Sequence, residues 1–94
     1  LKKQLMTDDY LETLVSMAEN IVRSLASGGK LLICGTGGSA ADAQHLAAEL
    51  LVRLRSQVNR QGIPAISLAL DTSTITACAN DYSFEYLYER MVQT

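Results

Sequence analysis

The residues of this chain best suited to chemistry are His45 and Glu49. They are four residues apart, so on a helix they share one face, with Asp42 one turn before them and Arg53 one turn after. The spacing leaves three interpretations open: an ordinary surface pair, half of a metal site, or an acid–base pair. Surface pairs of this kind are common on helices. A metal site would need at least one further ligand, and the sequence shows no convincing one.

A glycine-rich turn precedes this pair. Residues 31–34 form an apolar run that predicts a strand buried on both faces of a parallel sheet, and residues 35–38 then turn the chain. Ser39 is predicted to N-cap the following helix, with Asp42 as its capping-box partner. The start of a helix offers free amides and a partial positive charge. The sequence therefore predicts a site for a phosphate or carboxylate; the alternative is a tight turn that binds nothing.

Two other phosphate-binding motifs do not fit this turn. The pattern Gly35-x-Gly37-x-x-Ala40 matches the dinucleotide fingerprint, which expects an acidic residue about 20 positions further on. Residues 53–58 contain no acidic residue, and the next predicted strand ends only at Asp71. A P-loop requires a Lys-Ser/Thr pair after its glycines, which is absent here.

A long helix is predicted before the turn, over residues 7–27. Thr7 is a plausible N-cap, Asp8 and Asp9 oppose the helix dipole in the first turn, and Gly28 follows the last turn. We interpret this helix as scaffold or interface, without chemistry of its own. Its apolar residues recur at helical spacing: Leu11, Leu14, Val15, Ala18, Ile21, Val22 and Leu25.

A second buried strand is predicted over residues 64–70, parallel to the first because a helix connects the two. The polar residues 71–74 directly follow its carboxyl end, which is where open α/β sheets bind ligands. A short helix over residues 72–79 follows, and Asn80–Asp81 is read as a turn. Ser83 is predicted to cap a last helix.

The composition limits the class of protein. The chain has 94 residues, 48% apolar and 19% charged, with a net charge of −2. These values indicate a single soluble globular domain at most, without a surface for nucleic acid or an anionic membrane. Cys34 and Cys78 lack metal-type spacing and are expected to be buried thiols in a reducing compartment; the alternatives are a disulfide or a nucleophile. With no secretory leader visible, the cytoplasm is the expected location.

The chain is expected to need a further part. It does not begin with Met, it shows no secretory leader, and two parallel strands cannot make a self-sufficient α/β domain. We expect that the start of the chain is trimmed, and that either a longer polypeptide or another chain completes the sheet.

Three segments of the chain can be compared with known families: CGTGGSAADAQHLAAEL at 34–50, PAISLALDTS at 64–73 and ACANDYSFE at 77–85. Together and in this order, they resemble the SIS (sugar isomerase) domain family. Within that family they resemble the phosphoheptose isomerase branch. The resemblance implies an α/β fold, a three-layer αβα arrangement around a parallel five-stranded, Rossmann-like sheet. This chain would supply roughly the first half, with two strands and about four helices. Residues 1–94 would then be a partial SIS domain made of the helix 7–27, a substrate unit 31–55, and the second strand with following helices 63–94.

The resemblance also implies an activity. Such enzymes interconvert sedoheptulose 7-phosphate and D-glycero-D-manno-heptose 7-phosphate by enediol proton transfer, for heptose and lipopolysaccharide precursors. The resemblance also implies a homotetramer with active sites between subunits. By position, the resemblance assigns substrate binding to Thr36, Gly37, Gly38, Ser39, Glu49, Asn80 and Asp81. It makes Glu49 the catalytic base and, in zinc-containing members, His45 and Glu49 metal ligands.

Two departures from the family pattern bear on activity. Thr36 stands where the family commonly has Asn, and the chain ends before a second Ser/Thr-rich phosphate loop and a carboxyl-terminal Gln and His. We therefore expect the 94 residues alone to be inactive. Two other functions stay open: a non-catalytic SIS-type sugar-phosphate regulator or adaptor for a replication initiator, which would lack the base at Glu49, and a dinucleotide-binding module.

Overall fold

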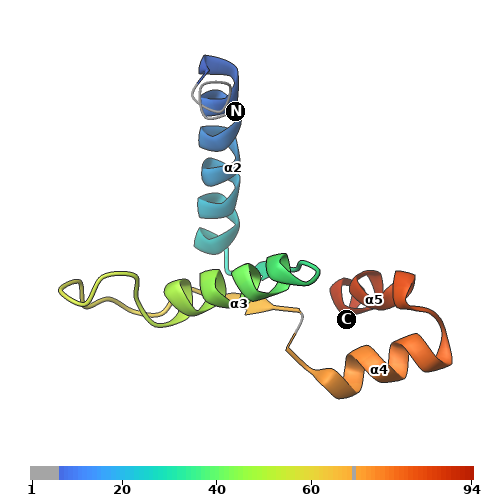
Figure 1. Ribbon diagram of the computed structural model, residues 1–94. Helices are drawn as coiled ribbons and strands as arrows, with labels where there is room; N and C mark the ends of the chain where they lie inside the picture. The colour runs from blue at the N-terminus through green and yellow to red at the C-terminus, as the bar shows by residue number, and fades with distance from the viewer. Residues whose placement is uncertain (1–6, 69) are drawn as a thin grey trace.

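The computed structural model describes residues 7–68 and 70–94 and confirms a mixed helix and strand fold (Figure 1). A parallel pair of strands and four α-helices form within the described residues, as predicted. The elements in chain order are α2 (Asp8–Ala26), β1 (Leu31–Ile33), α3 (Gly38–Leu51), β2 (Ala65–Ser67), α4 (Thr72–Asp81), the 3-10 helix η1 (Phe84–Tyr86) and α5 (Leu87–Gln93).

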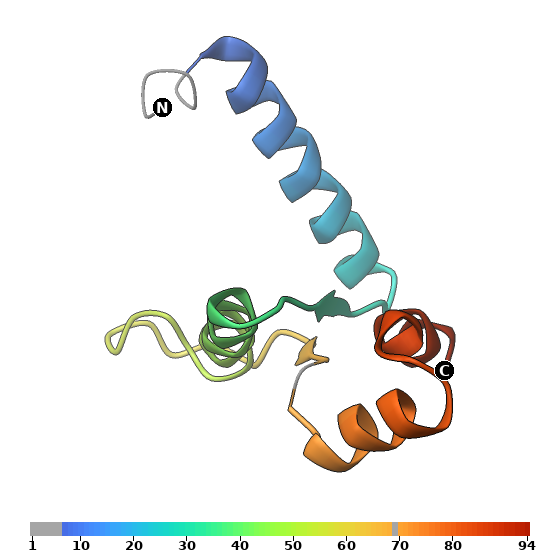
Figure 2. The same cartoon turned by 45° about the vertical axis from the view of Figure 1, so that its right-hand side comes forward.

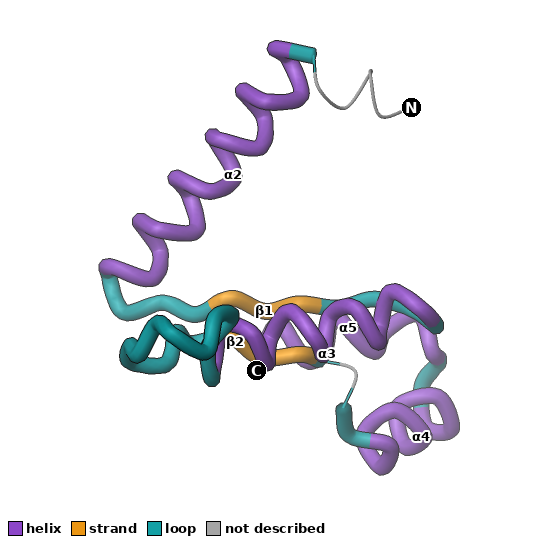
Figure 3. The backbone as a smooth tube through the Cα atoms, turned by 60° about the vertical axis from the view of Figure 1, so that its left-hand side comes forward, coloured by secondary structure: helices purple, strands orange, loops and turns teal. Residues whose placement is uncertain are grey.

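The strands β1 and β2 are parallel, and α3 connects them and packs against both (Figure 3). Leu31 pairs with Ala65, and Ile33 pairs with Ser67. The buried face of β2 presents the small residues Ala65 and Ser67, while Ala43 and Ala47 of α3 are also buried. Small residues on a helix and a strand let the two backbones approach closely, so this contact fixes α3 over the sheet.

The expectation that the strands are buried on both faces was wrong for the described chain. All three residues of β1 are half-buried, and Ile66 of β2 is 46% exposed between the buried Ala65 and Ser67. Alternate residues of a strand point to opposite faces, so α3 covers one face of β2 and the face with Ile66 stays open. An apolar run indicates a strand that can be covered on both faces, but the cover must come from other segments.

Helix α2 extends away from the remainder of the chain (Figures 1 and 2). It begins after Thr7 and ends before Ser27, as its N-cap, first-turn acids and following glycine predict. None of its residues is buried, and Leu14, Val15 and Val22 are each more than half exposed. The apolar stripe predicted from helical spacing is therefore real, and most of it is exposed; only Ile21 and Leu25, toward the end of the helix, are half-buried. No helix in the described part of the chain is long and apolar enough to cross a bilayer.

The cysteines differ from their expected setting. Cys78 of α4 is buried, and its thiol lies 3.6 Å from the carbonyl oxygen of Ser83 as a weak donor. Cys34 is exposed, which corrects its predicted burial. The reason is local: β1 ends at Ile33, so Cys34 already belongs to the turn that leaves the sheet. Both thiols are free.

The carboxyl end of β2 leads into α4, as predicted, but α4 is longer than expected. Asp71 is its N-cap, and the helix continues through Asn80 and Asp81 instead of ending at 79. These two residues occupy the last turn and not a turn after the helix, because Tyr82, at the C-cap, is the residue that leaves helical geometry. Ser83 then caps η1, which runs directly into α5.

Asp71 gives this region a pH dependence. A side-chain hydrogen bond from Thr74, then backbone hydrogen bonds from Thr74 and Ser73, lower the pKa of the Asp71 carboxyl below its ordinary 3.8. The native carboxylate therefore binds a proton less readily than the unfolded chain does. Its contribution to stability is complete above pH 3.8 and is lost as pH falls through the lower native pKa.

We expect acidification from about pH 5 to about pH 2 to destabilise the start of α4 more in the wild type than in Asp71→Asn. Asparagine is also a good N-cap, so this variant keeps the helix but has no carboxyl to titrate. Hydrogen exchange of the α4 amides measures the difference. Equal acid sensitivity in the two proteins would contradict the role of Asp71.

Candidate functional site

The glycine-rich turn connects β1 to α3, and the helix begins earlier than predicted. Gly37 is the N-cap, with φ 62° and ψ −120°, and Gly38 is the first helical residue. Ser39 therefore lies in the first turn, and the predicted capping box of Ser39 and Asp42 does not form. Gly37 is the physical cause, because its positive φ, which a residue with a side chain rarely adopts, turns the chain straight into the helix.

Gly35 is required for a different reason, namely close approach. A Cβ built on Gly35 would collide with the backbone carbonyl and the Cβ of Ser39. The end of β1 and the first turn of α3 are thus pressed against each other. By contrast, a Cβ on Gly37 or Gly38 would meet nothing within 4 Å, so space is open in front of these two residues.

The first turn of α3 offers donors to a ligand. The Ser39 amide donates to the Thr36 carbonyl at 3.2 Å, and the Ala40 amide donates to the Gly37 carbonyl at 3.1 Å. No backbone acceptor in the described chain takes the Gly38 amide. Thr36, Gly37, Gly38 and Ser39 are all exposed. The turn therefore combines a free amide, open space and the positive end of a helix, which suits an anionic group.

Further along α3, the predicted pair of His45 and Glu49 forms. The His45 Nε2 and Glu49 Oε1 atoms are 3.0 Å apart, the His45 side chain is 76% exposed and that of Glu49 is 29% exposed. This contact places a ring nitrogen of His45 against the carboxylate and restricts the orientation of that carboxylate. Within the described residues no group of three or more His, Cys, Asp or Glu could hold a metal ion.

Of the two other predicted members of this polar face, Asp42 lies on the helix as predicted and Arg53 does not. Arg53 was expected one turn beyond Glu49 on the same helix, but α3 ends at Leu51 and Arg53 follows it. Its guanidinium donates instead to the Ser56 carbonyl at 2.9 Å. Asp42 is on α3 and exposed.

Arg60 holds the end of α3 that carries Glu49, a role that the sequence did not reveal. Its guanidinium donates to the carbonyl of Glu49 at 2.8 Å and to that of Leu50 at 2.9 Å. These are among the last carbonyls of the helix, which have no intrahelical partner. Gly62 also packs against the Leu51 carbonyl, where a Cβ would be 2.5 Å away. Arg60 reaches back ten residues from a polar loop, and no sequence periodicity marks such a contact.

Asn80 and Asp81 belong to a different element from the loop and Glu49, the last turn of α4. Both are exposed at the end of α4, and the Asn80 side-chain amide donates to the Asp81 carboxylate at 3.0 Å. No hydrogen bond or ion pair within residues 7–68 and 70–94 joins them to the glycine-rich turn or to Glu49. The structure thus gathers one set of predicted site residues along α3 and leaves this second pair separate.

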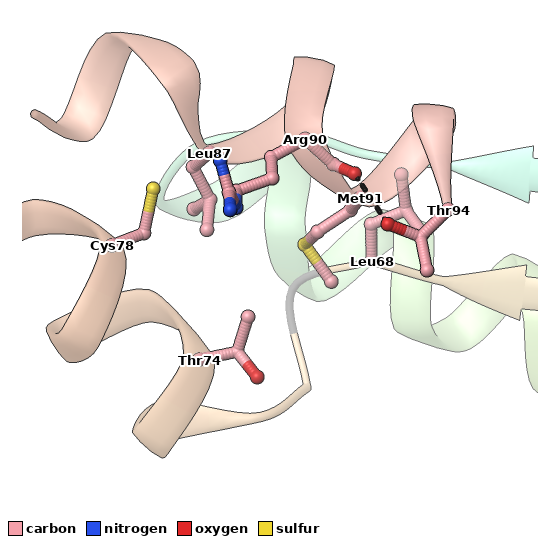
Figure 4. Close-up of a pocket in the computed structure, with 7 residues that line it drawn as sticks. All are labelled: Leu68, Thr74, Cys78, Leu87, Arg90, Met91 and Thr94. Carbon is pink, nitrogen blue, oxygen red and sulfur yellow. Dashed lines mark hydrogen bonds between the residues drawn. The ribbon is translucent and has the colours of Figure 1, made fainter. Parts of the chain in front are cut away.

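A cavity of about 370 Å³ opens between α4, α5 and the end of β2 (Figure 4). It contains none of the predicted site residues. Its walls are mostly apolar, and its one charged residue, Arg90, lies over the Tyr82 ring at 4.5 Å. The cavity lacks converging polar groups, so it resembles uncovered core more than a binding site. The lining residues are Leu68, Thr74, Cys78, Leu87, Arg90, Met91 and Thr94.

The helix sets the spacing between the two functional features. Gly38 and Glu49 are eleven residues apart on α3, so they are separated by about 16 Å along the helix axis. Side chains of a helix lean toward its N-terminus, which brings the Glu49 carboxylate somewhat closer to the turn. A ligand that met both would have its anionic group and its reacting atoms at opposite ends of an extended molecule.

Comparisons with known proteins agree on one family. The SIS domain family matches residues 3–93 of the chain. The phosphoheptose isomerase of Chlorobaculum parvum is 52% identical over 82 residues, which are 87% of this chain and 39% of that protein. The phosphoheptose isomerase of Paramagnetospirillum magneticum is 54% identical over 77 residues, which are 82% of this chain and 39% of that protein.

Solved structures show the same similarity. The phosphoheptose isomerase GmhA of Neisseria gonorrhoeae has a TM-score of 0.77 and 39% identity, over 98% of this chain and 43% of that one. A phosphoheptose isomerase of Francisella tularensis has a TM-score of 0.75 and 38% identity, over 83% of this chain and 40% of that one. The chain spans about two fifths of the length of these relatives.

Proposed function

The chain belongs to the SIS domain family, and we propose that it is the amino-terminal part of an isomerase of heptose phosphates. The full-length protein would interconvert sedoheptulose 7-phosphate and D-glycero-D-manno-heptose 7-phosphate. Residues 1–94 would form part of one SIS domain. The observation that supports this best is the arrangement on α3, which has an exposed turn with a free amide at one end and a half-buried carboxylate near the other.

In this proposal Glu49 is the catalytic base. Isomerisation of a ketose to an aldose removes a proton from C1, forms an enediol, and returns a proton to C2 while the hydroxyl proton moves between the two oxygens. A carboxylate beside the reacting carbons can accept and return that proton. His45 holds the carboxylate through its 3.0 Å contact, and Arg60 holds the helix end through the Glu49 carbonyl.

The spacing on α3 suits the proposed substrate. In sedoheptulose 7-phosphate the carbonyl carbon and the phosphate are at opposite ends of the sugar. The exposed amide of Gly38 could receive an anionic group, and the reacting carbons would then extend along α3 toward Glu49. We assign substrate contacts to Thr36, Gly37, Gly38, Ser39 and Glu49, and to Asn80 and Asp81 once the protein is complete.

A zinc ion fits these residues as a half-site. An imidazole nitrogen and a carboxylate oxygen are ordinary zinc ligands, and His45 and Glu49 hold theirs 3.0 Å apart on one helix face. We propose that they would contribute two ligands, with the others coming from outside the described residues. Zinc, when bound, polarises the substrate carbonyl.

We also propose a homotetramer in which α2 packs against other subunits. The support is the exposed apolar stripe of α2, with Leu14 58% and Val22 63% exposed, since an unpaired apolar face of this length is costly in water.

The exposed free thiol of Cys34 is consistent with a reducing compartment, and we place the protein in the cytoplasm, in lipopolysaccharide precursor synthesis.

The test is turnover of sedoheptulose 7-phosphate by the full-length protein, measured before and after chelation and accompanied by elemental analysis. We expect turnover, a zinc content near one ion per subunit, and loss of activity on chelation. Residues 1–94 alone are expected to show none. A full-length protein that binds the sugar phosphate without converting it would contradict the proposal and favour a non-catalytic regulator.

A further inference from the structure

We propose that Tyr88 is a positioning residue for the glycine-rich turn, an inference that rests on the proposed role of that turn in substrate binding. The Tyr88 hydroxyl, on α5, donates a hydrogen bond to the backbone carbonyl of Gly35, in the turn that follows β1. The two residues are 53 positions apart. Within the described chain, this is the one side-chain hydrogen bond that joins α5 to the unit of β1, α3 and β2.

Tyr88 is less exposed to solvent than the two tyrosines that precede it in the sequence. Tyr82 and Tyr86 are 61% and 54% exposed, whereas Tyr88 is half-buried with its hydroxyl in a part-buried hydrogen bond. A tyrosine hydroxyl removed from water needs a partner, and here the partner is the carbonyl of Gly35. The ring therefore supplies packing, and the hydroxyl supplies an additional, directional contact.

The geometry of Gly35 explains how this contact reaches the turn. The Gly35 carbonyl and the Thr36 amide belong to one planar peptide unit and point in opposite directions. Fixing the carbonyl with a hydrogen bond therefore fixes the direction of the Thr36 amide as well. Gly35 is also packed against Ser39, so closely that no Cβ would fit. The peptide unit between Gly35 and Thr36 is therefore constrained by two interactions: the hydrogen bond from α5 and the packing of Gly35 against the first turn of α3.

The hydrogen bond from Tyr88 matters for binding more than for chemistry. Tyr88 contacts the backbone of the turn, and the turn is proposed to hold the substrate in both the ground state and the transition state. An interaction of equal strength in both states affects KM and leaves kcat nearly unchanged. Loss of the hydroxyl should therefore weaken substrate binding while the proton transfer at Glu49 continues.

The test compares Tyr88→Phe with Tyr86→Phe in the full-length protein. Tyr86→Phe removes a hydroxyl from an exposed ring and is the matched control. In Tyr88→Phe we expect KM to rise about 3- to 10-fold with kcat within about twofold of wild type. We also expect faster hydrogen exchange of the Ser39 and Ala40 amides, which donate backbone hydrogen bonds within the turn, in Tyr88→Phe and no change in Tyr86→Phe.

Wild-type exchange of these amides in Tyr88→Phe overturns the proposal, and so does a fall in kcat at unchanged KM. The exchange measurement does not depend on turnover. If the full-length wild type shows no isomerase activity, the proposed function fails, and exchange alone decides whether Tyr88 positions the turn.

Discussion

Replacing Glu49 with glutamine in the full-length protein is expected to lower kcat by about 100- to 10,000-fold, the range of a lost general base. Glutamine has nearly the same shape and can still accept from His45, but it cannot take a proton from carbon. Because the substitution keeps nearly the same volume at a side chain that is still 29% exposed, we expect little loss of stability. Steady-state kinetics and thermal unfolding, measured on the same sample, separate the two effects.

The matched control for this substitution is Glu85→Gln. Glu85 is exposed on η1 and makes no hydrogen bond or ion pair within the described residues, so the control makes the same chemical change at a neutral site. It should leave kcat and KM at wild-type values. If Glu49→Gln retains full activity, Glu49 is not the base. If it binds substrate with wild-type affinity and no turnover, the assignment holds.

The second large effect concerns the glycines of the turn, where two substitutions should behave differently. Gly38→Ala adds a methyl group in open space, at a helical position where alanine is favoured by up to about 1 kcal/mol. The fold should therefore be unchanged or slightly more stable. The same methyl group would occupy the space that an anion needs beside the free amide. We expect KM to rise at least about tenfold, a loss of about 1.4 kcal/mol of binding.

Gly35→Ala should instead damage the fold. Its Cβ would collide with the backbone of Ser39, which cannot move aside as a flexible side chain could. We expect a loss of about 1–3 kcal/mol of stability together with weaker substrate binding. If the turn binds no ligand, Gly38→Ala will leave KM unchanged while Gly35→Ala still destabilises the protein. The pair therefore distinguishes a binding loop from a tight turn.

The order of the elements could be predicted because it depends on local patterns. The apolar spacing of α2 and its flanking Thr7 and Ser27 define that helix within the chain itself. The start of α3 was misplaced by two residues because Ser39 is the better cap by residue type. Gly37 is the N-cap instead, because its positive φ turns the chain into the helix two residues earlier. Residue preferences for the N-cap position do not take this conformation into account.

The candidate site was predictable to the extent that its contacts lie within one helix. The spacing of His45 and Glu49 was sufficient to predict their contact, and the structure confirms it. The supporting contacts of Arg60 and Tyr88 were not predictable, since each joins segments that are separated by a loop or by several elements. The roles of Asn80 and Asp81 remain predictions, because they depend on cover that other segments would provide.

The open face of β2 has a consequence for synthesis on the ribosome. If these residues are made before the segments that cover Ile66, the nascent chain must hold a half-finished parallel sheet in water for the seconds that the rest requires. The exposed apolar stripe of α2 is a second surface that could aggregate during the same interval. We therefore expect the chain to depend on holding chaperones while these two surfaces are uncovered, and to lose that dependence once both are packed.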